Sequence, residues 1–226
     1  KATDATGNVS TTAIPVSREI KYVVEEIDTI TAPGASFTAA PWVEWGDFNG
    51  DGLDDLAVGD PEADSYTGGV YIYYGRTNGG VPAIPDANIA IADGTGSGWE
   101  LAVGNFNGDT TAGGKPIYDI AVGAIDGGSY DFEGVVFIYF GAETTGLPSS
   151  PDVVISPNAG SGNQLGYALD SFNWNGDEYD DLAIGTYQYA AHESPVYMFL
   201  GRDIWAATYT AGDDTAPAYN GDADLV

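Results

Sequence analysis

The sequence predicts an all-β fold made of about three repeated units, each with about four short strands. A loop rich in Asp, Asn and Gly occurs three times, and each copy is followed by a five-residue apolar run that ends at a glycine. The 226 residues include 32 glycines and 12 prolines, and 43% of the residues are hydrophobic. Many short strands joined by tight turns fit this composition better than long helices do.

The spacing of the loops indicates a β-propeller. They begin at Asp47, Asn105 and Asn173, and the second interval is somewhat longer than the first. The second loop holds a six-residue insertion between Asp109 and Asp119, and without it the two intervals are nearly equal. A period near 60 residues with about four strands per unit is typical of propeller blades. The repeated loop-and-strand motifs cover residues 47–59, 105–123 and 173–185.

The apolar runs are expected to be buried strands. They read Val-Tyr-Ile-Tyr-Tyr from Val70, Val-Phe-Ile-Tyr-Phe from Val136 and Val-Tyr-Met-Phe-Leu from Val196. β-Branched and aromatic residues between glycines are typical of such strands rather than of helices. A further repeated segment begins at Asp86 and Asp152, and its third copy, residues 222–226, is interpreted as the start of a new repeat.

Residues 28–226 are therefore predicted to hold about three blades and one further strand, which is a partial β-propeller. A closed propeller typically has four to eight blades, so three blades cannot close the ring. We expect either that more chain exists or that another subunit completes the open edges. The chain starts at Lys1 rather than Met, which indicates a processed product or an excised fragment.

Each loop carries oxygen-bearing side chains at alternate positions, which indicates a metal site. In the first loop Asp47, Asn49 and Asp51 stand at positions 1, 3 and 5, so their oxygens should converge on one side of a tight turn. Leu53 would add its backbone carbonyl at position 7, and Asp55 would close the site at position 9. Six to eight oxygen ligands from a flexible loop suit calcium better than magnesium, which needs a stricter octahedron.

The sequence thus predicts up to three calcium ions. An EF-hand is excluded, because it needs a Glu at position 12 and the residues there are Val58, Pro116 and Ile184. The first loop has three carboxylates and the others two, so we expect the first to bind calcium most tightly and the second no more tightly than the third. The alternative is that these loops are turns without metal. The predicted ligands of the second and third loops are Asn105, Asn107, Asp109 and Asp119, and Asn173, Asn175, Asp177, Tyr179 (through its carbonyl) and Asp181.

These loops and strands resemble FG-GAP repeats, the blades of the integrin α-subunit β-propeller and of many bacterial and archaeal surface proteins. The resemblance covers about residues 28–226, and Gly59-Asp60-Pro61 and Leu165-Gly166-Tyr167 are similar to the two halves of the family's name. The sequence departs from the family where Ala39-Ala40 stands in place of Phe-Gly, and at the insertion in the second loop. The resemblance implies that the metal ions are structural and tie strands together within a blade.

The charge of the chain limits its partners. Six Lys and Arg face 34 Asp and Glu, which gives a net charge of −28, so nucleic acid and anionic membrane surfaces are repelled. No apolar run approaches the roughly 20 residues of a membrane-spanning helix, and we expect no membrane insertion. The acidity has two open explanations, namely a halophilic or calcium-rich setting and an ordinary acidic secreted protein.

Catalytic candidates are few, and we expect the chain not to be an enzyme. The one histidine, His192, is most simply a solvated loop residue, and the sequence has no cysteine and no Gly-x-Ser-x-Gly motif. Paired carboxylates lie inside the predicted metal loops or in ordinary turns. Most aromatic residues are expected in the core, whereas Trp42, Trp45 and Trp205 have no repeat equivalent and could contact a carbohydrate.

Residues 1–27 differ from the rest, because Ala2 to Ser10 resembles the last hairpin of bacterial Ig-like domains. A lone strand is unstable, so this segment should pair with a blade, another domain or a neighbouring chain. We expect a calcium-binding module of a secreted or cell-surface adhesin-like protein that binds a protein or glycan on a cell or matrix surface. The alternatives are a structural subunit that self-associates through this N-terminal segment, and an accessory domain of a larger secreted hydrolase or lyase.

Overall fold

A computed structural model describes residues 42–77, 82–89, 96–126, 133–157, 164–187, 194–203 and 205–211. The predicted N-terminal segment 1–27, the departure at Ala39-Ala40, His192 and the segment 222–226 lie outside these residues. Within them the chain is all-β apart from one helical turn, α1 (Ala63–Tyr66). The predicted all-β fold is confirmed.

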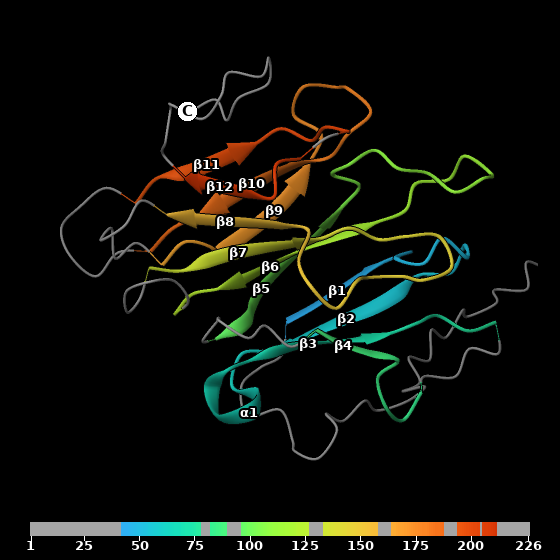
Figure 1. The fold of residues 1–226 in the computed structure, drawn as a ribbon, viewed down its shortest axis with the longest axis horizontal. Coiled ribbons are helices and arrows are strands. Elements are labelled where there is room, and N and C mark those ends of the chain that lie inside the picture. Colours follow the sequence, from blue (N-terminus) through green and yellow to red (C-terminus); the bar gives the residue numbers. More distant parts are fainter. Residues whose placement is uncertain are drawn as a thin grey trace, which may run out of the picture.

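The strands form three sheets that lie side by side, as expected for consecutive propeller blades (Figure 1). The first sheet has the order β1-β2-β3-β4, the second β5-β6-β7-β8, and the third β9-β10-β11, and all these neighbours are antiparallel. The described residues form an open arc rather than a closed ring. The strands are β1 (Trp42–Gly46), β2 (Asp55–Asp60), β3 (Gly69–Tyr73), β4 (Ala87–Ile89), β5 (Ser97–Gly104), β6 (Asp119–Ala124), β7 (Val135–Tyr139), β8 (Val153–Pro157), β9 (Ala168–Phe172), β10 (Asp181–Gly185) and β11 (Val196–Phe199).

The segments after Asp86 and Asp152 do not open a new repeat, which corrects the interpretation made from the sequence. They form β4 and β8, which pair with β3 and β7 and close each blade as its fourth strand. The two Asp side chains fix this pairing in the same way, because Asp86 Oδ2 accepts the Tyr74 amide at 2.9 Å and Asp152 Oδ2 accepts the Phe140 amide at 2.8 Å.

The core lies between the blades. Alternate residues of a strand point to opposite faces of the sheet, so the middle blade buries one set of side chains against each neighbour. Ile120 and Val122 of β6 join the core shared with the first blade, whereas Ala121 between them joins the core shared with the third. Because the middle sheet is apolar on both faces, a run such as Val-Val-Phe-Ile-Tyr in β7 is buried at every position.

Glycines allow neighbouring blades to approach closely at two repeat-equivalent places. A Cβ atom on Gly59 would collide with the carbonyl oxygen of Gly98, and one on Gly123 would collide with that of Gly166. The Gly59-Asp60-Pro61 and Leu165-Gly166 segments singled out in the sequence are therefore parts of blade–blade contacts.

One further strand, β12 (Thr208–Ala211), crosses from the third blade to the second. It pairs with β8 in parallel, with Thr208 opposite Val154. Trp205, just before β12, donates its indole N–H to the Phe106 carbonyl at 3.1 Å and packs against Phe140. This segment links the two blades, and Trp205 is half-buried where they meet.

Candidate metal centres

The three Asp/Asn loops follow β1, β5 and β9 and share one backbone shape. At position 4, Gly50, Gly108 and Gly176 have φ of 70°, 72° and 76°, which is the left-handed conformation that glycine adopts without strain. At position 3, each Asn side-chain oxygen accepts the amide of position 5, at 2.9, 3.0 and 2.9 Å in loop order. Three copies of an Asx turn thus place the side chains of positions 1, 3 and 5.

The position 9 carboxylates, Asp55, Asp119 and Asp181, are buried. Each one begins the strand that follows its loop, and it connects the loop to the end of the apolar run, which is the next strand along the chain. One oxygen accepts the position 2 amide, at 2.9, 2.8 and 2.7 Å in loop order. The other oxygen accepts the amide of the glycine that ends the following apolar run, at 2.8, 3.0 and 2.9 Å. The structure therefore gives this predicted ligand a structural task that does not depend on a metal ion.

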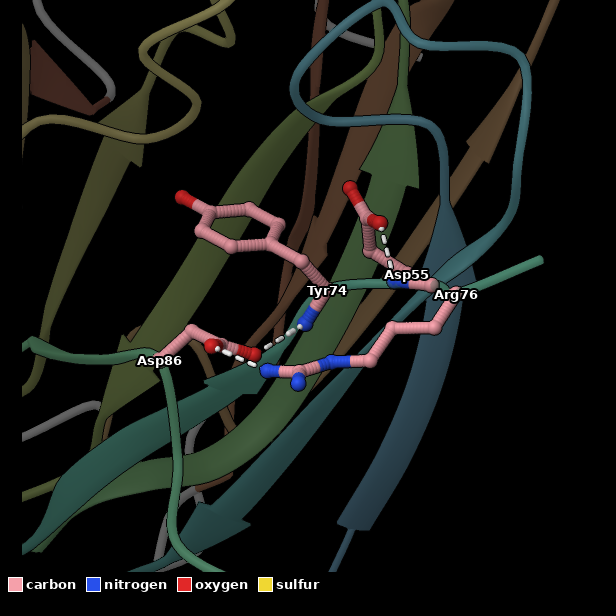
Figure 2. A network of polar contacts seen from close by, with 5 residues as sticks. Asp55, Tyr74, Arg76 and Asp86 are labelled. Carbon is pink, nitrogen blue, oxygen red and sulfur yellow. Dashed lines mark hydrogen bonds and ion pairs between the residues drawn. The ribbon is translucent and has the colours of Figure 1, made fainter. Parts of the chain in front are cut away.

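Figure 2 shows this arrangement in the first blade. Asp55 Oδ1 accepts the Gly75 amide at the end of β3. On the two sides of that glycine, Asp86 accepts the Tyr74 amide and forms an ion pair with Arg76 at 2.8 Å. Two carboxylates thus hold the end of β3, one from the first Asp/Asn loop and one from the residue before β4.

The second loop has side-chain oxygens that lack a partner. Asn105 Oδ1 and Asp109 Oδ1 are buried and accept no hydrogen bond from the described residues. Asn105 donates through Nδ2 to the Asp109 carbonyl at 3.0 Å, which fixes the orientation of its amide group. Unpaired buried oxygens cost free energy, and a cation would satisfy them. These residues fit a metal site.

The first loop concentrates negative charge around a buried carboxylate. Burial raises the pKa of Asp55 to about 6, and the nearby Asp51 and Asp47 carboxylates contribute to the increase although two backbone amides oppose it. Asp47 accepts the amides of Asp51 and Gly52 at 3.0 and 2.7 Å, so the loop itself partly satisfies this side chain. A divalent cation would favour the ionised form of all three carboxylates.

The third loop has the same turns but is more open. Asn173, Asn175 and Asp177 are exposed, and Asn173 Oδ1 accepts the Gly176 amide at 2.6 Å. Asp177 accepts the Tyr179 amide at 2.9 Å and an Asn175 N–H at 2.7 Å. The side-chain oxygens of Asn173 and Asp177 are therefore already hydrogen-bonded. Because these residues are exposed, water also competes with them for a cation.

No cluster of three or more His, Cys, Asp or Glu side chains within the described ranges is arranged to hold a metal ion. A cation in these loops would therefore need Asn and backbone oxygens beside the carboxylates. That is the mixed ligand set that the sequence predicts.

The insertion in the second loop forms a small closed turn and leaves the rest of the loop in register. Thr111 donates its amide to the Lys115 carbonyl at 2.8 Å, and the Ile117 amide donates to the Asp109 carbonyl at 3.2 Å. Counted back from Asp119, position 7 is Ile117. The sequence left this position undecided, although the spacing between positions 7 and 9 in the other two loops would have identified it.

The insertion also lies against the first loop. The Thr111 methyl group lies next to Gly50, and the Lys115 ammonium lies next to Gly52. Lys115 was not identified from the sequence, because it belongs to the next repeat and is far along the chain from the loop that it approaches. This positive charge opposes cation binding in the first loop, which the count of carboxylates does not take into account.

The other two tryptophans considered for carbohydrate contact have different surroundings. Trp42 donates its indole N–H to the Glu100 carboxylate and stacks on Trp99 with 5.6 Å between ring centroids. Trp45 is exposed.

Comparison with known proteins identifies the repeat. Residues 39–73, which include β1, β2 and β3, match the family described as FG-GAP repeat. The chain carries an FG-GAP repeat. It is also 35% identical to phosphatidylinositol-glycan-specific phospholipase D of Mus musculus over 180 residues, which is 72% of this chain and 21% of that protein. It is 34% identical to integrin alpha-7 of Homo sapiens over 146 residues, which is 62% of this chain and 11% of that protein.

The sequence resemblance to FG-GAP repeats and integrin α subunits is thereby confirmed. The chain spans about a fifth of the length of the phospholipase D relatives it matches, and the similarity concerns a β-propeller type of repeat. No helix among the described residues is long and apolar enough to cross a membrane.

Proposed function

We propose that this FG-GAP chain is a non-catalytic, calcium-binding β-propeller module. The observation that carries the proposal is the pair of buried oxygens without partners, Asn105 Oδ1 and Asp109 Oδ1, in a loop shape that occurs three times. In each loop, the residues at positions 1, 3, 5 and 9 and the carbonyl of position 7 would hold the ion. Calcium would neutralise the clustered carboxylates and crosslink the loop to the strand that follows.

The order of affinities has two opposing physical arguments. The count of carboxylates favours the first loop and ranks the third at least equal to the second. The unpartnered oxygens of the second loop favour that loop instead, because Asn105 Oδ1 and Asp109 Oδ1 need not give up an internal hydrogen bond before they bind an ion. Calorimetry on variants that leave one intact loop each would decide between these arguments.

We propose that the whole protein is located outside the cell or on its surface, and that it binds a protein or a glycan. The similarity to an integrin alpha chain supports an adhesion role.

A second candidate is an accessory, non-catalytic part of a larger hydrolase, because relatives named as phospholipase D contain a similar region within a much longer chain. A structural subunit of a filament or surface layer is the third candidate. The presence of a catalytic domain elsewhere in the parent gene would separate the second candidate from the others.

A thermal melt of the chelator-stripped protein, titrated with calcium and with magnesium as the control, tests calcium binding. A site that binds only the folded state adds about 2.7 kcal/mol when free calcium is about 100 times the dissociation constant. For a chain of this size that corresponds to an increase in the melting temperature of about 5–10 °C per site.

A matched pair of variants links this increase to the second loop. Asp109→Ala removes a proposed ligand, and Asp203→Asn changes an exposed carboxylate outside the three loops. We expect Asp109→Ala to lose about a third of the calcium-dependent increase and Asp203→Asn to retain all of it. No calcium-specific increase in the unmodified protein would show that the loops are turns without metal.

A further inference from the structure

Each of the three Asp/Asn loops contains an Asn-Gly pair at positions 3 and 4. The pairs are Asn49-Gly50, Asn107-Gly108 and Asn175-Gly176. The backbone nitrogen of the residue after an asparagine can attack the side-chain carbonyl carbon of that asparagine. Glycine leaves this nitrogen most accessible, because it has no Cβ atom to block the approach. These three asparagines are therefore the ones in the loops that are most open to this attack.

The reaction replaces the side-chain amide by a carboxylate and needs only water. The glycine nitrogen loses its proton to solvent and bonds to the asparagine Cγ, and the bond between Cγ and Nδ2 breaks, so that ammonia leaves. Water then opens the five-membered imide ring at one of its two carbonyl carbons. Opening at Cγ gives aspartate, and opening at the backbone carbonyl gives isoaspartate, in which the main chain runs through Cβ and Cγ.

The Asx turns favour this attack equally in all three loops. In each loop the asparagine Oδ1 accepts the backbone amide of position 5, at 2.9, 3.0 and 2.9 Å in loop order. Negative charge develops on this oxygen when the nitrogen attacks Cγ, and a hydrogen-bond donor at such a distance stabilises that charge. A difference in rate between the loops must therefore come from the nitrogen that attacks or from the group that leaves.

The attacking nitrogens have different surroundings. In the third loop the Gly176 amide donates to Asn173 Oδ1 at 2.6 Å. This hydrogen bond has to be given up before the nitrogen can lose its proton and attack. The amides of Gly50 and Gly108 donate no hydrogen bond to any group in the described part of the chain. The nitrogen is therefore available in the first and second loops but held in the third.

The leaving groups also differ. Asn175 Nδ2 donates to Asp177 Oδ2 at 2.7 Å. Burial raises the pKa of Asp109, and a side-chain hydrogen bond with Asn107 opposes the increase. Asn49 Nδ2 donates to no group within the described ranges, so of the three asparagines only Asn49 has both the nitrogen that attacks it and its own leaving group without hydrogen bonds.

Solvent exposure alone would predict the opposite order. Asn175 is exposed, and no atom lies within 4 Å of the place that a Cβ on Gly176 would occupy. Asn49 is half-buried, and the Thr111 methyl group lies next to Gly50. Exposure therefore makes the third loop the first to react, whereas the hydrogen bonds make it the last.

We propose that Asn49 is a site of spontaneous deamidation in the folded protein, and that it reacts faster than Asn107, which in turn reacts faster than Asn175. The order follows from hydrogen bonds within the chain and does not depend on a bound metal ion. For the proposed calcium site of the first loop, conversion to aspartate would turn an amide ligand into a fourth carboxylate, whereas isoaspartate would lengthen the backbone between two ligands. Either product would change the calcium affinity of that loop as the protein ages.

Peptide mapping by mass spectrometry tests this order on the unmodified chain, aged in mildly alkaline buffer with a chelator. The three pairs are matched in sequence, because each follows an aromatic residue and precedes an aspartate. In urea, where the fold is lost, all three should therefore react at similar rates. In the folded protein we expect Asn49 to react at least about fivefold faster than Asn175, which is the effect of one ordinary hydrogen bond on a rate. Asn107 should fall between them.

The replacement Asn173→Ala gives a second readout in the same experiment. It removes the acceptor that holds the Gly176 amide, so Asn175 should react faster. The rate at Asn49 should stay the same, which also shows that the variant remains folded. Equal rates at Asn49 and Asn175 in the folded protein, or a faster reaction at Asn175, would overturn the proposal. The same holds for a difference that persists in urea, or for an Asn173→Ala variant in which Asn175 reacts no faster.

Discussion

The replacement Asp119→Ala tests whether the position 9 carboxylates support the fold independently of a metal ion. Asp119 is fully buried, and it accepts two buried amides, those of Phe106 at 2.8 Å and Gly141 at 3.0 Å, as well as the partly buried Asn107 amide at 3.3 Å. Alanine would leave both buried amides without a partner, at about 1–3 kcal/mol each. Burial, with a smaller contribution from Asp109, raises the pKa of Asp119 well above its ordinary value, so removing the carboxylate also relieves a cost. The net loss of stability should be about 3 kcal/mol.

Thermal melts at pH 7 in the presence of a chelator measure this loss directly. For a domain of this size a loss of about 3 kcal/mol lowers the melting temperature by about 6–12 °C. Asp109→Ala is the control from the same loop, because Asp109 Oδ1 has no hydrogen-bond partner, and it should change the metal-free melting temperature by less than about 3 °C. Equal melting temperatures for the two variants in chelator would refute the division of the loop into structural and metal-binding carboxylates.

Two further predictions concern residues outside the loops. Gly123→Ala should destabilise the chain by about 2 kcal/mol or more in urea unfolding, because the new Cβ meets the Gly166 carbonyl. Gly113→Ala should be nearly neutral, because its Cβ would make only an ordinary van der Waals contact with the Thr111 hydroxyl. Burial and the neighbouring Asp170 raise the pKa of Glu44, so its ionisation lowers stability as the pH rises above 4.5 through the folded-state pKa. Asp170→Asn should therefore increase stability at pH 7 by up to about 1 kcal/mol and leave it nearly unchanged at pH 4.

The local parts of the fold could be predicted from the sequence because they depend on short-range patterns. The apolar runs that begin at Val70 and Val136 form β3 and β7, and the Asx turns follow from Asn and Gly at fixed positions. Three copies of each pattern made the repeat visible. The role of Asp86 was misread because a short match shows that a segment recurs, but not which strand it pairs with.

The contacts between distant segments could not be predicted in this way. β12 pairs with β8 although the whole third blade lies between them in the chain, and the pairing is parallel, which no periodicity indicates. Lys115 reaches the first loop only because the insertion of the second loop folds towards it. Both cases depend on how one blade sits against the next, and this packing is decided by side chains that lie far apart in the sequence.

The same limit applies to the predicted ligands. Asp109 and Asp119 lie in the same loop, and from the sequence both are predicted to bind the metal ion. The structure distinguishes them, because Asp119 already accepts backbone amides, whereas Asp109 keeps an oxygen without a partner. A loop that used all its carboxylates on the ion would lose its shape whenever the ion left. A loop in which one carboxylate also holds the following strand keeps its shape without the ion, so the proposed calcium ion would meet a preformed turn and its binding would not have to offset the cost of ordering the loop.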